Sequence, residues 1–271
     1  MADLPSFYER DGINPETYDA RSEAHIASGA TAGDAAWYAR KCREWGGAVL
    51  EGACGTGRVA WTLAEAGVEV VGFDLSPHML ARAEAKRAHA SPAAALRARF
   101  VQGDLRSFDV GRRFRTALVP FRSFQVLLTP EDQRACLDRF RAHLERGGRL
   151  VLDLFDPLYA ALGTELPPSI RGRAEVPLPG RGTTLVQEIS RDSVDPVNQV
   201  LSETWTFEER DASGKVLRRE QERLRMRWSF RWELRHLFAL AGFEVEAEYS
   251  DFRESPPAYA KELIWVLRAR P

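Results

Sequence analysis

Short runs of apolar residues alternate with amphipathic segments along the first 156 residues of the chain. The apolar runs are continuous, which is typical of strands buried on both faces of a parallel sheet. They predict five strands, at residues 48–52, 68–74, 98–104, 116–121 and 148–156. The segments between them predict helices at residues 58–67, 76–88 and 130–148. This alternation indicates an α/β fold with a doubly wound, mostly parallel sheet.

The pattern changes on either side of this region. Residues 1–46 are mostly helical in pattern, whereas residues 157–182 are rich in proline and glycine. Three segments joined by the turn sequences DPVN and DASG then predict antiparallel strands, at residues 183–193, 199–210 and 215–228. A helix at 232–242 and strands at 243–252 and 261–270 are expected to rejoin the main sheet. We therefore expect four parts: an N-terminal helical lid (1–46), a core (47–156), an antiparallel β cap insert (157–230) and a C-terminal helix with two strands (231–271).

Composition narrows the function classes. The chain has 271 residues, a net charge of −1 and 44% hydrophobic residues, which is ordinary for a globular protein. Without a net positive field, we expect no nucleic-acid partner. The three cysteines lack metal-ligand spacing, so we expect no metal site. Their small, odd number also indicates reduced thiols in a cytoplasmic protein. We expect this protein to be a monomer or a homodimer. No apolar run approaches the ~20 residues that span a bilayer, and the first residues lack a signal-peptide core, so we expect no membrane partner.

The strongest chemical signal is the segment VLEGACGTG at residues 49–57, where the first strand turns into a helix. Gly55 and Gly57 allow a tight turn and a close approach of the backbone to a ligand. The helix that follows presents free N–H groups and a positive dipole end. Together with Asp74, which lies 19 residues after Gly55, the turn also satisfies the dinucleotide-binding pattern. Two classes of cofactor therefore compete for it.

Three features separate these cofactors. Glu51 ends the first strand, and a carboxylate there suits a cationic cofactor better than a pyrophosphate, which it would repel. The pair Gly103-Asp104 places another carboxylate on the carboxyl edge of the sheet, where open α/β sheets bind ligands. The link between the last two strands, SPPAYAKE, is too short for a crossover helix, so these strands are antiparallel.

At these residues the chain resembles the class I S-adenosylmethionine-dependent methyltransferases, most closely over residues 48–156 and less closely over 232–271. The matching pieces are VLEGACGTG, VVGFDLSPHMLARAEAK, FVQGDLRSFD and AHLERGGRLVLDLF. The resemblance implies a Rossmann-like seven-stranded sheet with an antiparallel last strand, and S-adenosylmethionine as cofactor, leaving as S-adenosylhomocysteine.

The resemblance also implies the roles of the cofactor-binding residues. The turn from Glu51 to Gly57 would hold the methionine part, Asp74 the ribose hydroxyls, and Asp104 the adenine. Tyr18 in TYDA would cover the cofactor from the lid, or pack only within it. The full set implied is Tyr18, Glu51, Ala53, Cys54, Gly55, Gly57, Arg58, Asp74, Leu75, Met79, Gly103, Asp104, Leu105 and Pro120. Ala53 stands where the family more often has glycine, so we expect a backbone there that does not need glycine.

The acceptor site is less well defined by the sequence. In the family, the segment after the fourth strand builds the floor of the site, here PFRSFQVLL. Either phenylalanine of this segment fits a core position equally well, and the arginines of RLRMRW also fit a solvated strand face. Candidate substrate-binding residues are Trp37, Tyr38, Phe121, Arg122, Ser123, Phe124, Arg225 and Tyr249. Candidate catalytic groups are Ser123, Gln125 and Asp156, with Asp153 as a further possible acid or base.

No histidine stands out as a base, which favours methylation of nitrogen over oxygen, since an amine that is neutral in the site needs little acid–base machinery. The layout is also similar to bacterial sugar-amine and glycine/sarcosine N-methyltransferases. We therefore predict a methyltransferase that acts on a small-molecule acceptor, more readily at an amine. Three alternatives stay open: a small-molecule O-methyltransferase, a nicotinamide-dependent oxidoreductase that uses the same turn, and a non-catalytic S-adenosylmethionine-binding protein.

Overall fold

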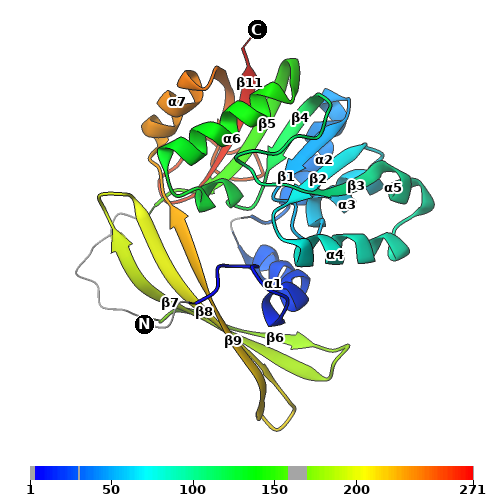
Figure 1. Ribbon diagram of the computed structural model, residues 1–271, viewed down its shortest axis with the longest axis vertical. Coiled ribbons are helices and arrows are strands. Elements are labelled where there is room, and N and C mark those ends of the chain that lie inside the picture. Colours follow the sequence, from blue (N-terminus) through cyan, green and yellow to red (C-terminus); the bar gives the residue numbers. More distant parts are fainter. Residues whose placement is uncertain (1–3, 30, 158–169, 271) are drawn as a thin grey trace.

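The apolar runs of the sequence form the inner strands of a seven-stranded sheet (Figure 1). The structure is a computed structural model that describes residues 4–29, 31–157 and 170–270. The order of strands across this sheet is β10 (Phe243–Tyr249), β11 (Glu262–Ala269), β5 (Leu144–Phe155), β4 (Phe114–Val119), β1 (Val49–Gly52), β2 (Val70–Asp74) and β3 (Ala98–Gln102). Only β11 runs against its neighbours, β10 and β5; the pairings among β1 to β5 are parallel. The predicted seven-stranded sheet with its antiparallel last strand is confirmed.

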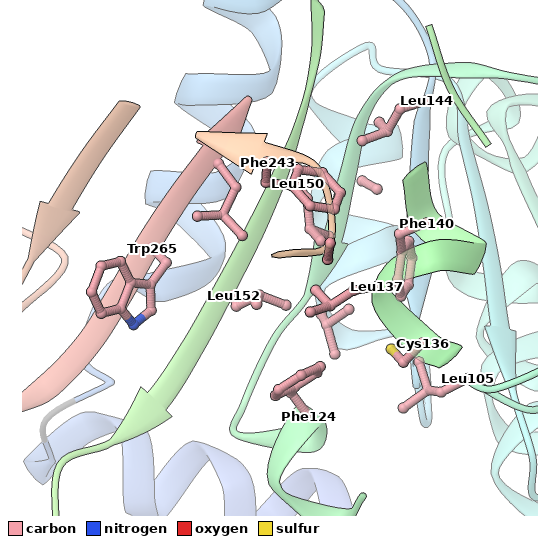
Figure 2. Close-up of a cluster of buried hydrophobic side chains, with 14 of the residues drawn as sticks. Leu105, Phe124, Cys136, Leu137, Phe140, Leu144, Leu150, Leu152, Phe243 and Trp265 are labelled. Carbon is pink, nitrogen blue, oxygen red and sulfur yellow. The ribbon is translucent and has the colours of Figure 1, made fainter. Parts of the chain in front are cut away.

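Helices cover both faces of this sheet. They are α2 (Asp34–Trp45), α3 (Arg58–Glu65), α4 (Pro77–Ala85), α5 (Pro92–Arg97), α6 (Pro130–Ala142) and α7 (Arg231–Leu240), with short 3₁₀ turns η1 (Lys86–His89) and η2 (Ser123–Val126). Successive residues of β5 point to opposite faces: Leu150 and Leu152 pack with α6 and α7, whereas Val151 packs with α2 and α3. Figure 2 shows the first of these two cores, in which Leu137 of α6 lies next to Leu152 and Phe140 belongs to the same cluster. The sheet is therefore buried on both sides, as its continuous apolar strands predict.

The helix predicted at 130–148 is shorter than expected. The structure ends α6 at Ala142, and β5 already begins at Leu144, which pairs with Phe114 of β4. His143 makes this early end possible, because its ring nitrogens lie 2.8 Å from the Arg139 carbonyl oxygen and 3.1 Å from the Asp109 carboxylate. The glycine stop at 147–148 lies within the strand instead.

A second, four-stranded antiparallel sheet lies beyond β5 along the chain, in the order β6 (Ile170–Leu178), β7 (Thr183–Asp195), β8 (Val200–Arg210) and β9 (Val216–Arg227). Three of these strands and both turns were predicted. In the first turn, Asp195 accepts hydrogen bonds from the amides of Val197 (3.0 Å) and Asn198 (3.1 Å). Strand β6 was missed because it contains Pro177 and Gly172; as an edge strand it tolerates a proline that cannot donate to the ladder.

Helix α1 (Ile13–Ser28) lies between the two sheets (Figure 1). Ile13 packs with Leu185 and Phe207 of the four-stranded sheet in a small third core. The helix has no N-cap side chain of its own; instead the Glu220 carboxylate of β9 accepts a hydrogen bond from the Ile13 amide at 2.8 Å. A negative charge there complements the positive end of the helix dipole. The four-stranded sheet thus fixes the orientation of α1.

Candidate active site

The loop between β1 and α3 contains three residues with left-handed backbone, namely Ala53 (φ +52°), Gly55 (φ +56°) and Gly57 (φ +73°). A side chain at Gly57 would place its Cβ 2.9 Å from the ring of Phe100, so glycine is required there for space as well as for backbone conformation. The backbone at Ala53 does not require glycine, as expected, but its left-handed conformation favours glycine over alanine. An alanine in this region costs roughly 1–2 kcal/mol of local strain.

Replacing Ala53 with glycine is therefore expected to stabilise the protein. The strain relief exceeds the ~0.5–1 kcal/mol of extra backbone entropy that glycine loses on folding, which leaves a gain of about 0.5 kcal/mol. Urea denaturation of Ala53→Gly measures it. The matched control is Ala32→Gly, at an exposed position outside the regions of positive φ, which should lower the free energy of unfolding. A destabilised Ala53→Gly variant would show that Ala53 is not strained.

Asp74, at the carboxyl end of β2, holds this loop. Its two carboxylate oxygens accept hydrogen bonds from the amides of Gly55 and Ser76, each at 2.8 Å. Burial raises the pKa of Asp74, while these amides lower it. Ser76 is the predicted N-cap of α4, and its hydroxyl accepts from the Met79 amide. Asp74 thus connects the glycine turn to the start of α4.

Glu51 lies one strand away and is 1% exposed. Its Oε2 has no hydrogen-bond partner in the described part of the chain. Burial raises the pKa of Glu51 to about 8, although Arg58 nearby lowers it. A buried carboxyl with an unsatisfied oxygen is costly, and such groups are found at binding and catalytic sites.

The third predicted acid, Asp104, is placed at the same edge by β3, through the Gly103 amide that donates to the Asp74 carbonyl at 3.0 Å. Its carboxylate is bound by the Arg106 guanidinium at 2.6 Å, which lowers the pKa of Asp104. Leu75 beside it is 63% exposed, unusual for a leucine, whereas Met79, Leu105 and Pro120 are buried. Cys54 is also buried, behind the turn.

The turn after β4 has a strained backbone. Phe121 (φ +57°) and Arg122 (φ +64°) are both left-handed without being glycine. The Asp153 carboxylate, at the end of β5, accepts hydrogen bonds from both of their amides, at 2.9 and 3.3 Å. It also accepts the hydroxyl of Tyr38 from α2. Burial raises the pKa of Asp153 to about 7, against the lowering effect of Tyr38.

The other candidates of this segment have structural partners. The Arg122 side chain forms an ion pair with Glu262 of β11. The Ser123 hydroxyl donates to the Pro120 carbonyl at 2.8 Å, and the Gln125 Oε1 accepts from the Phe155 amide at 3.0 Å. The Asp156 carboxylate accepts from the Ala260 amide at 2.7 Å. Their predicted roles in substrate binding or catalysis stay predictions.

Two predicted substrate residues are placed away from this edge. Phe124 is fully buried in the core of Figure 2, next to Leu152, so the alternative of a core residue holds. Arg225 is exposed on β9, where side chains alternate between faces; Glu220 and Glu222 point to α1, so Arg225 points away from it. Of the remaining aromatic candidates, Trp37 is buried against Tyr38 and Tyr249.

The N-terminal segment brings further groups to the edge. Tyr18 and Tyr8 are packed edge to face at 5.8 Å, and the Tyr8 carbonyl accepts from the Ser76 hydroxyl at 2.9 Å. Burial raises the pKa of both tyrosines. Glu222 of β9 accepts from the Tyr8 amide at 3.1 Å. Tyr8 belongs to the aromatic residues of the lid, whereas no sequence pattern marks Glu222, because only the tertiary fold brings it to Tyr8.

Helix α1 is attached to the glycine turn through one contact group. Asp19 accepts hydrogen bonds from the Thr56 hydroxyl at 2.6 Å and from the Lys86 ammonium at 2.7 Å. At the first residue of α3, directly after the glycine turn, Arg58 donates to both carboxylate oxygens of Asp34. Its guanidinium lies 5.3 Å from the Phe121 ring centroid. The residues predicted for the cofactor therefore share one edge of the sheet with α1 lying over it.

Comparison with known proteins identifies the domain that contains this edge. A protein-family model of a methyltransferase domain matches residues 49–148. A curated relative from Streptomyces fradiae, a dTDP-3-amino-3,6-dideoxy-alpha-D-glucopyranose N,N-dimethyltransferase, is 34% identical over 139 residues, which are 49% of this chain and 51% of that protein. The chain thus spans about half the length of this relative.

Two solved structures match over nearly the whole chain. The CcbJ methyltransferase from Streptomyces caelestis has 27% identity and a TM-score of 0.77, covering 98% of this chain and 99% of that one. The sugar N-methyltransferase KedS8 from Streptoalloteichus sp. has 25% identity and a TM-score of 0.71, covering 100% and 99%. Residues 49–148 therefore form a methyltransferase domain, and nearly the whole chain has the fold of the S-adenosylmethionine-dependent methyltransferases. Within the described residues, no helix is long and apolar enough to cross a bilayer.

Proposed function

We propose that the chain transfers the methyl group of S-adenosylmethionine to the nitrogen of a small-molecule amine, and that this amine belongs to an amino sugar. The observation that carries the proposal is the buried Glu51 with its unpartnered oxygen, beside the Asp74-braced glycine turn. Amino-sugar acceptors are supported by the names of the S. fradiae relative and of KedS8.

The residues at this edge fit the cofactor chemically. Asp74 would accept the ribose hydroxyls, and the exposed Leu75, with Met79 behind it, would lie beside the adenine. Asp104 and Leu105 would bind the adenine from the side of β3. An ammonium of the methionine part would favour the ionised form of Glu51 over the protonated form that burial favours, and it would give the orphan oxygen a donor. The left-handed turn from Ala53 to Gly57 leaves its backbone accessible to the same part.

Bound S-adenosylmethionine supplies a methyl group attached to a cationic sulfur. The chain then has to hold the acceptor nitrogen in line with the bond that breaks, and positioning of this kind can contribute ~7–11 kcal/mol. The nitrogen lone pair would form the new N–C bond while the electrons of the broken S–C bond go to sulfur, and the nitrogen would then release its proton to solvent. Phe121, whose ring centroid lies 5.3 Å from the Arg58 guanidinium, would line the acceptor site from the turn after β4, and the paired rings of Tyr8 and Tyr18 would cover it from the lid.

Residues 1–46 act as a lid in this proposal, with Asp19 as its attachment to the glycine turn. Asp19→Ala removes the bonds to Thr56 and Lys86, and we expect exchange of the α1 amides to rise about fivefold, the factor that ~1 kcal/mol corresponds to. Hydrogen–deuterium exchange measures it. Glu23→Ala, an exposed change on the same helix, serves as control. Equal exchange rates in both variants would show that Asp19 does not attach the lid to the glycine turn.

The function is tested with matched acceptors. The protein is incubated with S-adenosylmethionine and either a nucleotide-linked amino sugar or the same sugar with a hydroxyl in place of the amine. We expect methylated product and S-adenosylhomocysteine from the amine alone. Product from the hydroxyl sugar would establish an O-methyltransferase. Cofactor binding without product from any amine would favour a non-catalytic binding protein.

A further inference from the structure

The turn after β4 is held in a conformation that its sequence disfavours. Phe121 and Arg122 are consecutive left-handed residues that carry large side chains. Each costs roughly 1–2 kcal/mol relative to ordinary backbone, and such strain persists only where the surroundings determine it from several sides. The contacts of this turn therefore show what the fold maintains at this position.

The backbone of the turn is held by Asp153. Its two carboxylate oxygens accept the amides of Phe121 and Arg122, and its carbonyl accepts the Arg122 amide a second time, at 3.1 Å. Asp153 is completely buried, so the cost of burying this carboxyl is offset by these hydrogen bonds and by the Tyr38 hydroxyl. Tyr38 is equally buried, packed against Trp37 and Phe252.

The ring of Phe121 is held from the same helix. Asp34 stands four residues before Tyr38 on α2, so the two side chains project from one face of that helix. Asp34 binds the Arg58 guanidinium through two bonds, at 2.7 and 2.5 Å, and this guanidinium lies over the Phe121 ring. One face of α2 thus holds the backbone of Phe121 through Asp153 and its ring through Arg58.

We propose that Asp153 and Tyr38 are positioning residues that fix the Phe121–Arg122 turn and so determine where the acceptor amine sits relative to the transferred methyl group. The inference rests on the proposed function, since the acceptor must enter beside Phe121. It assigns no contact between either residue and the cofactor. Loosening the pair therefore affects the acceptor and leaves cofactor affinity intact.

Two conservative variants test the pair. Tyr38→Phe keeps the buried ring and removes only the hydroxyl, whereas Asp153→Asn keeps the shape and replaces one acceptor oxygen by a donor. The controls are Tyr259→Phe, on the exposed segment before β11, and Asp138→Asn, on the outer face of α6. For each protein, calorimetry gives the Kd for S-adenosylhomocysteine, and steady-state kinetics give KM and kcat for the amino-sugar acceptor.

We expect kcat/KM for the acceptor to fall at least tenfold in both variants, with most of the change in the acceptor KM, while the Kd for S-adenosylhomocysteine stays within twofold of wild type. Both controls should match wild type. Unchanged kinetics in Tyr38→Phe, or a parallel loss of cofactor affinity, would overturn the assignment in favour of a merely structural role. Wild-type protein without turnover on any amine would instead overturn the proposed function, and this inference with it.

Discussion

Replacing Glu51 by glutamine is expected to make the protein more stable and, at the same time, a poorer binder of the cofactor. Glu51 is buried, and its pKa is about 8 in the folded chain against 4.5 for the unperturbed side chain. The folded state therefore favours the protonated carboxyl. Its contribution to stability is fully present below pH 4.5 and is lost as the pH rises through 8.

The stability gain of Glu51→Gln should therefore be small at pH 4.5 and should grow to on the order of 5 kcal/mol at pH 9. Urea denaturation at several pH values measures it. Cofactor affinity should change in the opposite direction, because glutamine cannot ionise to face the ammonium of the ligand. The Kd for S-adenosylhomocysteine should rise at least tenfold, or ~1.4 kcal/mol. Glu244→Gln on the exposed side of β10 is the control for both measurements.

A glutamine variant with lower stability at pH 9 would contradict the account of Glu51 as a strained, functional carboxyl. So would a more stable variant with undiminished affinity, since the carboxyl would then have no ligand to explain its cost.

Replacing Asp74 by alanine is the second change with a large expected effect. The ribose hydroxyls would lose a charged acceptor, and the amides of Gly55 and Ser76 would lose theirs, so the turn itself would loosen. We expect the Kd for S-adenosylhomocysteine to rise at least tenfold, or ~1.4 kcal/mol. Calorimetry measures it, with Asp138→Ala on α6 as control. Unchanged affinity in Asp74→Ala would remove Asp74 from the proposed cofactor site.

Much of the fold was predictable because it depends on local patterns. Continuous apolar runs such as that around Val71 identify strands buried on both faces, and the short link before β11 requires an antiparallel pair. The end of α6 was not predictable, because the sequence LERGG at 144–148 is typical of the last turn of a helix. Only the pairing of Leu144 with Phe114 in the sheet shows that these residues belong to β5. The same holds for β6, whose proline is acceptable only because its outer edge is unpaired in the described sheet.

The candidate site divides in the same way. Glu51, Asp74 and Asp104 follow successive strands, so the topology alone brings them to one edge. The contacts of Asp153 with Tyr38, and of Tyr8 with Glu222, join residues more than a hundred positions apart. No spacing in the sequence reports such pairs. The substrate-binding role of Arg225 stays a prediction for a related reason: alternation shows which residues share a strand face, but only packing shows which face meets α1.

The central claim is methyl transfer to an amine nitrogen, and the position of the transferred carbon tests it most directly. The protein is incubated with S-adenosylmethionine carrying a ¹³C-labelled methyl group and an acceptor that contains both a primary amine and free hydroxyls. Carbon-13 NMR of the purified product then distinguishes an N-methyl from an O-methyl carbon. The account predicts a single labelled N-methyl signal, which decreases in Asp74→Ala; a labelled O-methyl signal in its place would contradict it.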